Sequence, residues 1–199
     1  MENPQSLVHF WFGTDPDDAV TAARQAGLWW GKDGAVDAEM ARRYGHLPDD
    51  ALAGRLDGWA ATPAGRLALI LVTDQFPRNI FRGTARAFAF DATARRLCRE
   101  GLAHGQDRAL RPIERVFFYL PLEHSEDADD QALSVTLFEA LAAEVAMPLQ
   151  PIFDGYADYA RRHRDIVARW GRFPHRNAVL GRASTAAEDA FLQEPGSSF

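Results

Sequence analysis

Residues 67–72 read Leu-Ala-Leu-Ile-Leu-Val, a stretch that is apolar on every side if it is wound into a helix. A helix of this kind is surrounded by other helices, because a surface helix keeps a polar face toward water. Thr62 and Pro63 stand shortly before it, and this pair is typical of a helix start. The threonine hydroxyl caps a free N–H group, and proline has no N–H to satisfy. We therefore expect a central helix around which the rest of the chain packs.

Signals for further helices extend from this stretch to both ends of the chain. Asn3 with Pro4 repeats the pattern of a capping residue before proline, and Thr185 with Glu188 forms a capping box ahead of a last short helix. The acids that follow Pro48 indicate another start. The alternation of apolar and polar residues that marks half-buried strands is hard to find. The sequence predicts an all-α fold of roughly nine or ten helices.

Three stretches carry apolar residues at helical spacing, at residues 113–120, 133–145 and 152–170. In the last stretch the apolar face includes Tyr159, His163 and Trp170, so we expect the imidazole of His163 to be buried.

Composition is that of an ordinary globular protein, with 199 residues of which 47% are hydrophobic and 25% charged. A chain of this length buries one substantial core, so a single all-helical domain over residues 1–199 is expected. The N-terminus lacks the features of a signal peptide, and no apolar run is long enough to cross a bilayer. The one cysteine, Cys98, has no partner for an internal disulfide. These features favour a cytoplasmic protein without a membrane partner.

The formal net charge of −6 is unevenly spread. Residues 76–115 hold nine arginines against four acids, and residues 161–182 hold seven against one. Residues 116–160 between them hold nine acids and no arginine or lysine. Such blocks are typical either of basic faces for an anionic partner or of helices that neutralise one another within the fold, and we favour neutralisation. Nucleic-acid binding is not expected, because the chain is acidic and carries no recognised motif.

Two short segments with a Phe-Pro pair stand out as candidates for ligand binding, residues 74–79 and 171–177. Proline disfavours helical geometry in the residue before it, so we predict that the helix stops at each phenylalanine and that a stiff turn follows. Two such turns would present arginines to a carboxylate or phosphate, with polar neighbours adding hydrogen bonds. The candidate binding residues are Asp74, Arg78, Asn79, Arg82, Arg172, Arg176 and Asn177.

A third polar segment, residues 121–127, favours acid–base chemistry. The candidate catalytic residues are His124, His163, His175, Glu123 and Asp127. The same segment also fits a plain helix start in which Ser125 is the cap and the acids lie in the first turn. Its spacing matches no recognised metal motif, so no metal site is predicted, and no cofactor is indicated. Motifs for a nucleophilic serine, for triphosphate binding and for dinucleotide binding are absent from the sequence.

These three segments resemble the hallmark segments of a bacterial family called domain of unknown function 924. They read LILVTDQFPRNIFRGTARAFAFD at residues 69–91, FFYLPLEHSED at 117–127 and GRFPHRNAVLGRAST at 171–185. The similarity extends from HFWFG at residues 9–13 to the last capping box. Membership implies a helical architecture similar to tetratricopeptide repeats, in which antiparallel helix pairs stack as a curved array. It implies no substrate, cofactor or catalytic residue.

Three hypotheses for function follow. In the leading one, the two Phe-Pro segments and the acidic segment meet at one concave site that binds a small anionic molecule, with acid–base capacity from the histidines. In the second, a stacked-helix scaffold binds a peptide or protein partner in its groove. In the third, the motifs are structural: each phenylalanine fills the core, each asparagine takes a left-handed turn, and each arginine pairs with an acid from residues 123–130.

Overall fold

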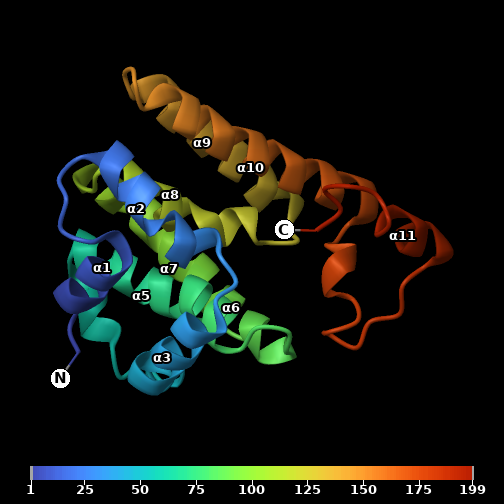
Figure 1. Cartoon of the computed structure of the whole chain (residues 1–199), viewed down its shortest axis with the longest axis horizontal. Coiled ribbons are helices and arrows are strands. Elements are labelled where there is room, and N and C mark those ends of the chain that lie inside the picture. Colours follow the sequence, from blue (N-terminus) through green and yellow to red (C-terminus); the bar gives the residue numbers. More distant parts are fainter. Residues whose placement is uncertain (1, 199) are drawn as a thin grey trace.

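The computed structural model describes residues 2–198, and every regular element in that range is helical (Figure 1). The prediction of an all-α fold is confirmed. No helix within this range is long and apolar enough to cross a membrane. The α-helices are α1 (Pro4–Phe12), α2 (Asp18–Trp30), α3 (Gly34–Tyr44), α4 (Leu47–Leu52), α5 (Pro63–Ile70), α6 (Phe76–Ile80), α7 (Asp91–Ala103), α8 (Pro112–Glu123), α9 (Ala128–Glu144), α10 (Gln150–Trp170) and α11 (Ala186–Phe191). Shorter elements are the 3-10 helices η1 (Asp57–Ala61), η3 (Ala85–Phe88), η4 (Gln106–Ala109) and η5 (Pro174–Arg176), and the π-helical turn η2 (Leu71–Gln75).

Helix α5 and the start of η2 form the centre of the main core. Residues 67–72 are at most 2% exposed, and α5 packs against α1, α7 and α8. Thr62 caps α5 by accepting a hydrogen bond from the N–H of Gly65, and Pro63 is its first residue. The predictions of a central buried helix and of its start are both confirmed.

The first Phe-Pro pair does not end its helix, so that prediction is wrong. Phe76 has helical dihedral angles (φ −58°, ψ −43°), and α6 follows η2 without a break. A proline ring ordinarily clashes with the carbonyl group four residues before it. Here the N–H of Phe76 bonds to the carbonyl of Leu71, five residues back, and this wider turn accommodates Pro77 directly after it. The helix changes its winding instead of stopping.

The second Phe-Pro pair lies in a turn as predicted, but the helix ends three residues before Phe173. Helix α10 ends at Trp170, Gly171 takes a left-handed conformation with φ of 68°, and Phe173 is extended (φ −93°, ψ 104°). The chain then turns through η5 and continues to α11.

Helices α9 and α10 run side by side as the longest pair of the fold (Figure 1). His163 of α10 is buried as predicted, at 5% exposed, whereas Tyr159 is 50% exposed and lies off the buried face. Beyond α10, a small second core packs the end of α10 against η5 and α11. This C-terminal core consists of Ile166, Val167, Phe173 and Phe191, with Trp170 at its edge.

Helix capping agrees with the sequence at some ends and differs at others. Asn3 caps α1 as expected and also forms a capping box with Ser6, and Thr185 forms the expected capping box with Glu188. Helix α9 is capped by Asp127, whose carboxylate accepts hydrogen bonds from two backbone N–H groups, and not by Ser125. Helix α4 begins at Leu47, so the acids after Pro48 lie in its first turn.

Candidate functional site

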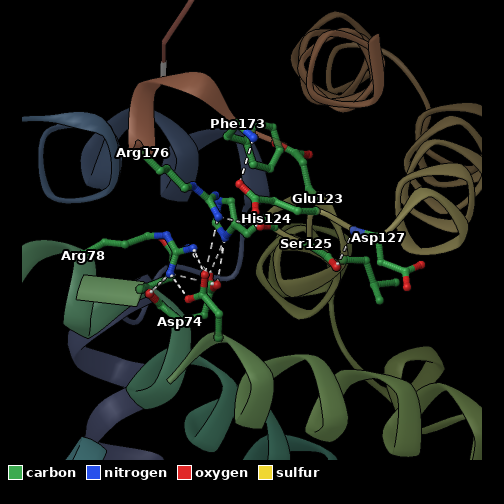
Figure 2. A network of polar contacts seen from close by, with 12 residues as sticks. Asp74, Arg78, Glu123, His124, Ser125, Asp127, Phe173 and Arg176 are labelled. Carbon is green, nitrogen blue, oxygen red and sulfur yellow. Dashed lines mark hydrogen bonds and ion pairs between the residues drawn. The ribbon is translucent and has the colours of Figure 1, made fainter. Parts of the chain in front are cut away.

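The candidate site lies where the π-helical turn, the end of α8 and the segment after α10 meet (Figure 2). The π-helical turn supplies Asp74, and α6 supplies Arg78 one turn later. The end of α8 supplies Glu123 and His124, while η5 supplies Arg176. Residues more than a hundred positions apart in the chain therefore surround one point.

Asp74 is the buried anchor of this cluster, with no exposed side-chain surface. Its two carboxylate oxygens lie 2.8 Å and 3.0 Å from Nδ1 of His124, and one of them lies 3.2 Å from Nη1 of Arg78. Burial by itself would raise the pKa of Asp74, but the Arg78 charge and the contact with His124 outweigh burial and hold this pKa well below its ordinary value. Asp74 is therefore an ionised carboxylate in a site without water contact.

His124 is held in one orientation by Asp74. Burial and the Arg78 charge lower the pKa of His124 despite the opposing effect of Asp74, so the ring is neutral at pH 7. A neutral ring beside a carboxylate carries its proton on Nδ1, which donates to Asp74. The side chain of His124 is 14% exposed and lines the pocket described below. Its Nε2 keeps a lone pair that no hydrogen bond among the described residues uses.

Glu123 and His163 form a second buried pair next to this contact. Oε1 of Glu123 lies 3.1 Å from Nδ1 of His163, and both residues are at most 5% exposed. Burial and the Asp74 charge raise the pKa of Glu123 to about 8, so its carboxyl group is protonated at pH 7. Burial lowers the pKa of His163 to about 2, and its Nδ1 donates to the carbonyl of Tyr159. The pair is neutral.

Arg78 is committed to two carboxylates. Its Nη1 and Nη2 donate to the two oxygens of Asp91 at 2.8 Å and 3.1 Å, and Nη1 also donates to the backbone carbonyl of Asp74. Both Nη groups of Arg78 are therefore engaged by protein oxygens, and Arg78 is not among the residues that line the pocket described below, so it acts on the site through its charge.

Arg176 differs from Arg78 in being buried without a full set of partners. It is 6% exposed, and its guanidinium lies between the rings of Phe88 and Phe173, 4.9 Å and 4.4 Å from their centroids. Nη1 donates to the carbonyl of His124 at 2.9 Å, and Asp91 lies 3.7 Å away. Nε is buried and has no hydrogen-bond partner among the described residues. Burial lowers the pKa of Arg176 to about 10, which leaves it charged at pH 7.

A pocket of about 290 Å³ opens beside these groups. His124 and Arg176 line it together with Asp91, Arg95 and Glu126. The remaining wall is largely apolar and comes from Phe88, Ala92, Pro121 and Leu180, with Ser125 at the edge. Sequence reasoning missed Phe88, Asp91 and Arg95 as wall residues, because nothing local in the sequence shows that α7 faces α8 at this point.

Three of the predicted site residues do not line the pocket and instead pair with acidic side chains of the protein. Arg82 and Asn79 both bond to Asp37 of α3. Arg172 forms a bidentate pair with Glu188 in α11.

The remaining candidates have structural contacts near the pocket. Asn177 bonds to Arg182 and Ser184 with φ of −56°, so the expected left-handed turn is wrong for it. Asp127 caps α9 and pairs with Arg95, pointing away from Asp74 in Figure 2. His175 packs against the ring of Phe173, and burial lowers its pKa to about 4. Within residues 2–198, no group of three His, Cys, Asp or Glu side chains is arranged to hold a metal ion.

Comparison with known proteins places the chain in a family without an assigned activity. It is similar to the solved structure of a protein of unknown function, ATU0120, from Agrobacterium tumefaciens, with 38% sequence identity, 96% of each chain covered and a TM-score of 0.79. No curated protein matches the chain significantly. The model of a family described as bacterial protein of unknown function (DUF924) matches residues 7–196, so the chain belongs to this family.

Proposed function

We propose that this protein binds a small anionic molecule, a phosphate or a carboxylate, in the pocket lined by Arg176 and His124. The observation that carries the proposal is the buried Arg176 guanidinium whose Nε has no hydrogen-bond partner. A buried unsatisfied N–H group costs about 1–3 kcal/mol, and more when it is charged. An anion in the pocket would accept hydrogen bonds from the guanidinium, which makes one hydrogen bond among the described residues, and would reach the buried Nε only if the side chains around it shift.

The acids around the pocket leave Arg176 available for such a ligand. Asp91 is held at both oxygens by Arg78, and Glu126 is held at both oxygens by Arg182. Asp91 is nearest to Arg176, but 3.7 Å is too long for a good hydrogen bond. A ligand oxygen therefore competes with no carboxylate already bonded to Arg176.

The pocket suits a small molecule with an anionic group and an apolar part. Its volume of about 290 Å³ lies just below the range for ligand sites, which starts at about 300 Å³. The anionic group would face Arg176, and an apolar part would contact Phe88 and Leu180.

A thermal-shift series with phosphorylated and carboxylated metabolites tests the proposal. A ligand specific to the native state raises Tm by mass action, with about 2.7 kcal/mol of stabilisation at a hundred times its Kd. We expect such a shift in the wild type and its loss in Arg176→Met, which keeps an unbranched apolar stem and removes the guanidinium. Arg172→Met is the matched control, since Arg172 belongs to the same segment but pairs with Glu188.

Retention of the full shift in folded Arg176→Met would contradict the proposal. No shift with any compound would favour the alternative, a tetratricopeptide-like scaffold that binds a peptide, and partner capture would then be the next experiment.

We also propose that the protein resides in a reducing cytoplasm. Its one cysteine, Cys98, is buried as a free thiol in the main core. Cell fractionation tests this, and recovery from the periplasm would contradict it.

A further inference from the structure

We propose that the pocket takes up a dianionic oxyanion of the phosphate-monoester class together with one proton, which is held on Nε2 of His124. This inference rests on the anion site proposed above and specifies its ligand and its protonation. Asp74 is a positioning residue in this account, because it acts on the ligand only through His124.

The orientation of the ring makes a proton necessary. Asp74 accepts the Nδ1–H of His124, so the ring nitrogen left without a hydrogen bond among the described residues is Nε2, which carries a lone pair, and the residue lines the pocket. An oxyanion that approaches Nε2 would face this lone pair with lone pairs of its own. Only a protonated Nε2 donates a hydrogen bond to it. Binding at this place therefore favours the imidazolium form.

The groups that face His124 determine whether anion binding raises or lowers the pKa of His124. Asp74 of η2 stabilises the imidazolium form, whereas Arg78 of α6 and Arg176 of η5 oppose it. A bound anion offsets the charge of Arg176 and adds a negative charge at Nε2, so the His124 pKa rises in the complex. The other titratable groups around the ring and the pocket are Glu123, which is protonated at neutral pH, the neutral His163 and His175, and the paired Asp91, Arg95 and Glu126.

The class of ligand follows from the two donors. Once His124 is protonated, three cations border the pocket; Arg95 is paired with Asp127 and Asp130, which leaves Arg176 and His124 as the two that have an N–H group for a ligand. Two cations balance two negative charges. A tetrahedral oxyanion presents oxygens in several directions, so that one oxygen meets Arg176 while another meets His124, whereas the oxygens of a single carboxylate lie in one plane. The apolar wall at Phe88 and Leu180 is suited to the organic part of a monoester.

Calorimetric titration with inorganic sulfate tests the inference, because sulfate stays dianionic from pH 6 to pH 8. Titrations at pH 6.5 in two buffers with different protonation enthalpies give the number of protons taken up for each sulfate bound. We expect uptake of about half a proton or more, and a Kd that rises about fivefold between pH 6 and pH 8.

Variants separate His124 from its neighbours. His124→Asn places an amide N–H where Nδ1 donates to Asp74 and removes the titrating ring, so we expect proton uptake to be lost. His104→Asn, at an exposed histidine that bonds to the Glu100 carbonyl, is the matched control and keeps the uptake.

Proton uptake at His124 rests on the anion site at Arg176, and different results would contradict each of them. Sulfate binding that depends on Arg176 but shows no proton uptake, or the same uptake in His124→Asn, would overturn the inference alone. Absence of sulfate binding to the wild type at every pH would overturn the inference and count against the anion site itself.

Discussion

Asp74 and His124 are in direct contact although fifty residues separate them in sequence. The contact depends on a carboxylate with no exposed surface, which remains ionised because Arg78 and His124 both face it. A buried charge that is paired and hydrogen-bonded in this way is costly to assemble and strongly oriented. At the scale of residues, the site is a histidine whose proton position is set by its neighbour.

The protonation of His124 should depend on that neighbour. In the free protein its pKa lies below the ordinary value of about 6.5, and Asp74 is the group that raises it. We expect Asp74→Asn to lower the His124 pKa further, by roughly one unit. NMR titration of the ring Cε1–H signals measures this. Asp37→Asn, which removes a carboxylate that pairs with Arg82, should leave the His124 signal unchanged, and an unchanged pKa in Asp74→Asn would show that the contact does not act as described.

Glu123 should make stability depend on pH. The pKa of Glu123 is about 8 in the folded protein and about 4.3 in the unfolded chain. The contribution of Glu123 to the free energy of unfolding is therefore fully present below pH 4.3 and is lost as the pH rises to 8. Glu123→Gln is neutral throughout. We compare the unfolding free energy of the variant with that of the wild type at each pH. We expect the difference, variant minus wild type, to be larger at pH 9 than at pH 5 by at least about 2 kcal/mol. Urea unfolding at several pH values measures it.

The control for that series is Glu139→Gln, at an exposed carboxylate that pairs with Arg161. If the unfolding free energies of the wild type and of Glu123→Gln change with pH by the same amount, Glu123 is not protonated as described.

The partners of individual arginines were only partly predictable. Sequence indicated that the basic and acidic blocks neutralise one another, and pairs such as Arg182 with Glu126 and Arg95 with Asp127 confirm this. Arg78 and Arg172 instead pair with Asp91 and Glu188, outside the acidic block. A guanidinium reaches any carboxylate that the fold brings near, and the spacing of residues along the chain does not contain that information.

At the scale of elements, local signals predicted the helix ends that depend on local chemistry. The capping residues Asn3, Thr62 and Thr185 act within three residues of themselves, and all three are confirmed. The π-helical turn before Phe76 was not predictable in this way. The turn lies inside the core, where Leu71 and Val72 are fully buried, and the N–H of Phe76 bonds to the carbonyl five residues back. That winding sets the direction of Asp74.

The segment after α10 is a separate element of the site that is held by a few polar contacts. Arg182 donates to both oxygens of Glu126 and to the carbonyl of Phe173, and Glu126 accepts the N–H of Phe173. These contacts join η5 to the loop between α8 and α9. We expect this junction to help hold Arg176 in its position in the pocket.

Removal of the junction should therefore loosen one segment and leave the main core unchanged. In Arg182→Gln we expect amide hydrogen exchange in residues 171–185 to accelerate about tenfold, with α5 unaffected. Arg161→Gln, which removes an exposed pair with Glu139, is the control and should change neither. Exchange in residues 171–185 that stays at the wild-type rate would mean that the C-terminal core alone holds the segment.

At the scale of the whole molecule, the pocket lies between the main core and the C-terminal core. One wall comes from the start of α7, another from the end of α8, and the third from η5 and the residues after it. Two of the three polar segments singled out in the sequence, 121–127 and 171–177, contribute residues to the pocket wall, whereas 74–79 contributes none and instead supplies Asp74, which contacts His124. The sequence did not predict which side chains of each segment face the pocket, because Asn79, Arg82 and Arg172 are drawn to acids elsewhere by the packing of α3 and α11.

The arrangement also explains why one arginine is exceptional. Ion pairs across helices satisfy most of the charges near the pocket, whereas Arg176 is buried between two phenylalanine rings with an unused Nε. A fold that maximised stability alone would pair or replace such a group. The central claim is therefore that Arg176 is reserved for a ligand.

The most direct test of this claim is a crystal structure of the protein with selenate, a heavier analogue of sulfate that anomalous diffraction locates without ambiguity. Our account predicts an anomalous peak in the pocket with an oxygen within about 3.2 Å of Nε of Arg176, and no such peak in Arg176→Met. Crystals that bind selenate only at other places, or a pocket peak that persists in Arg176→Met, would contradict it.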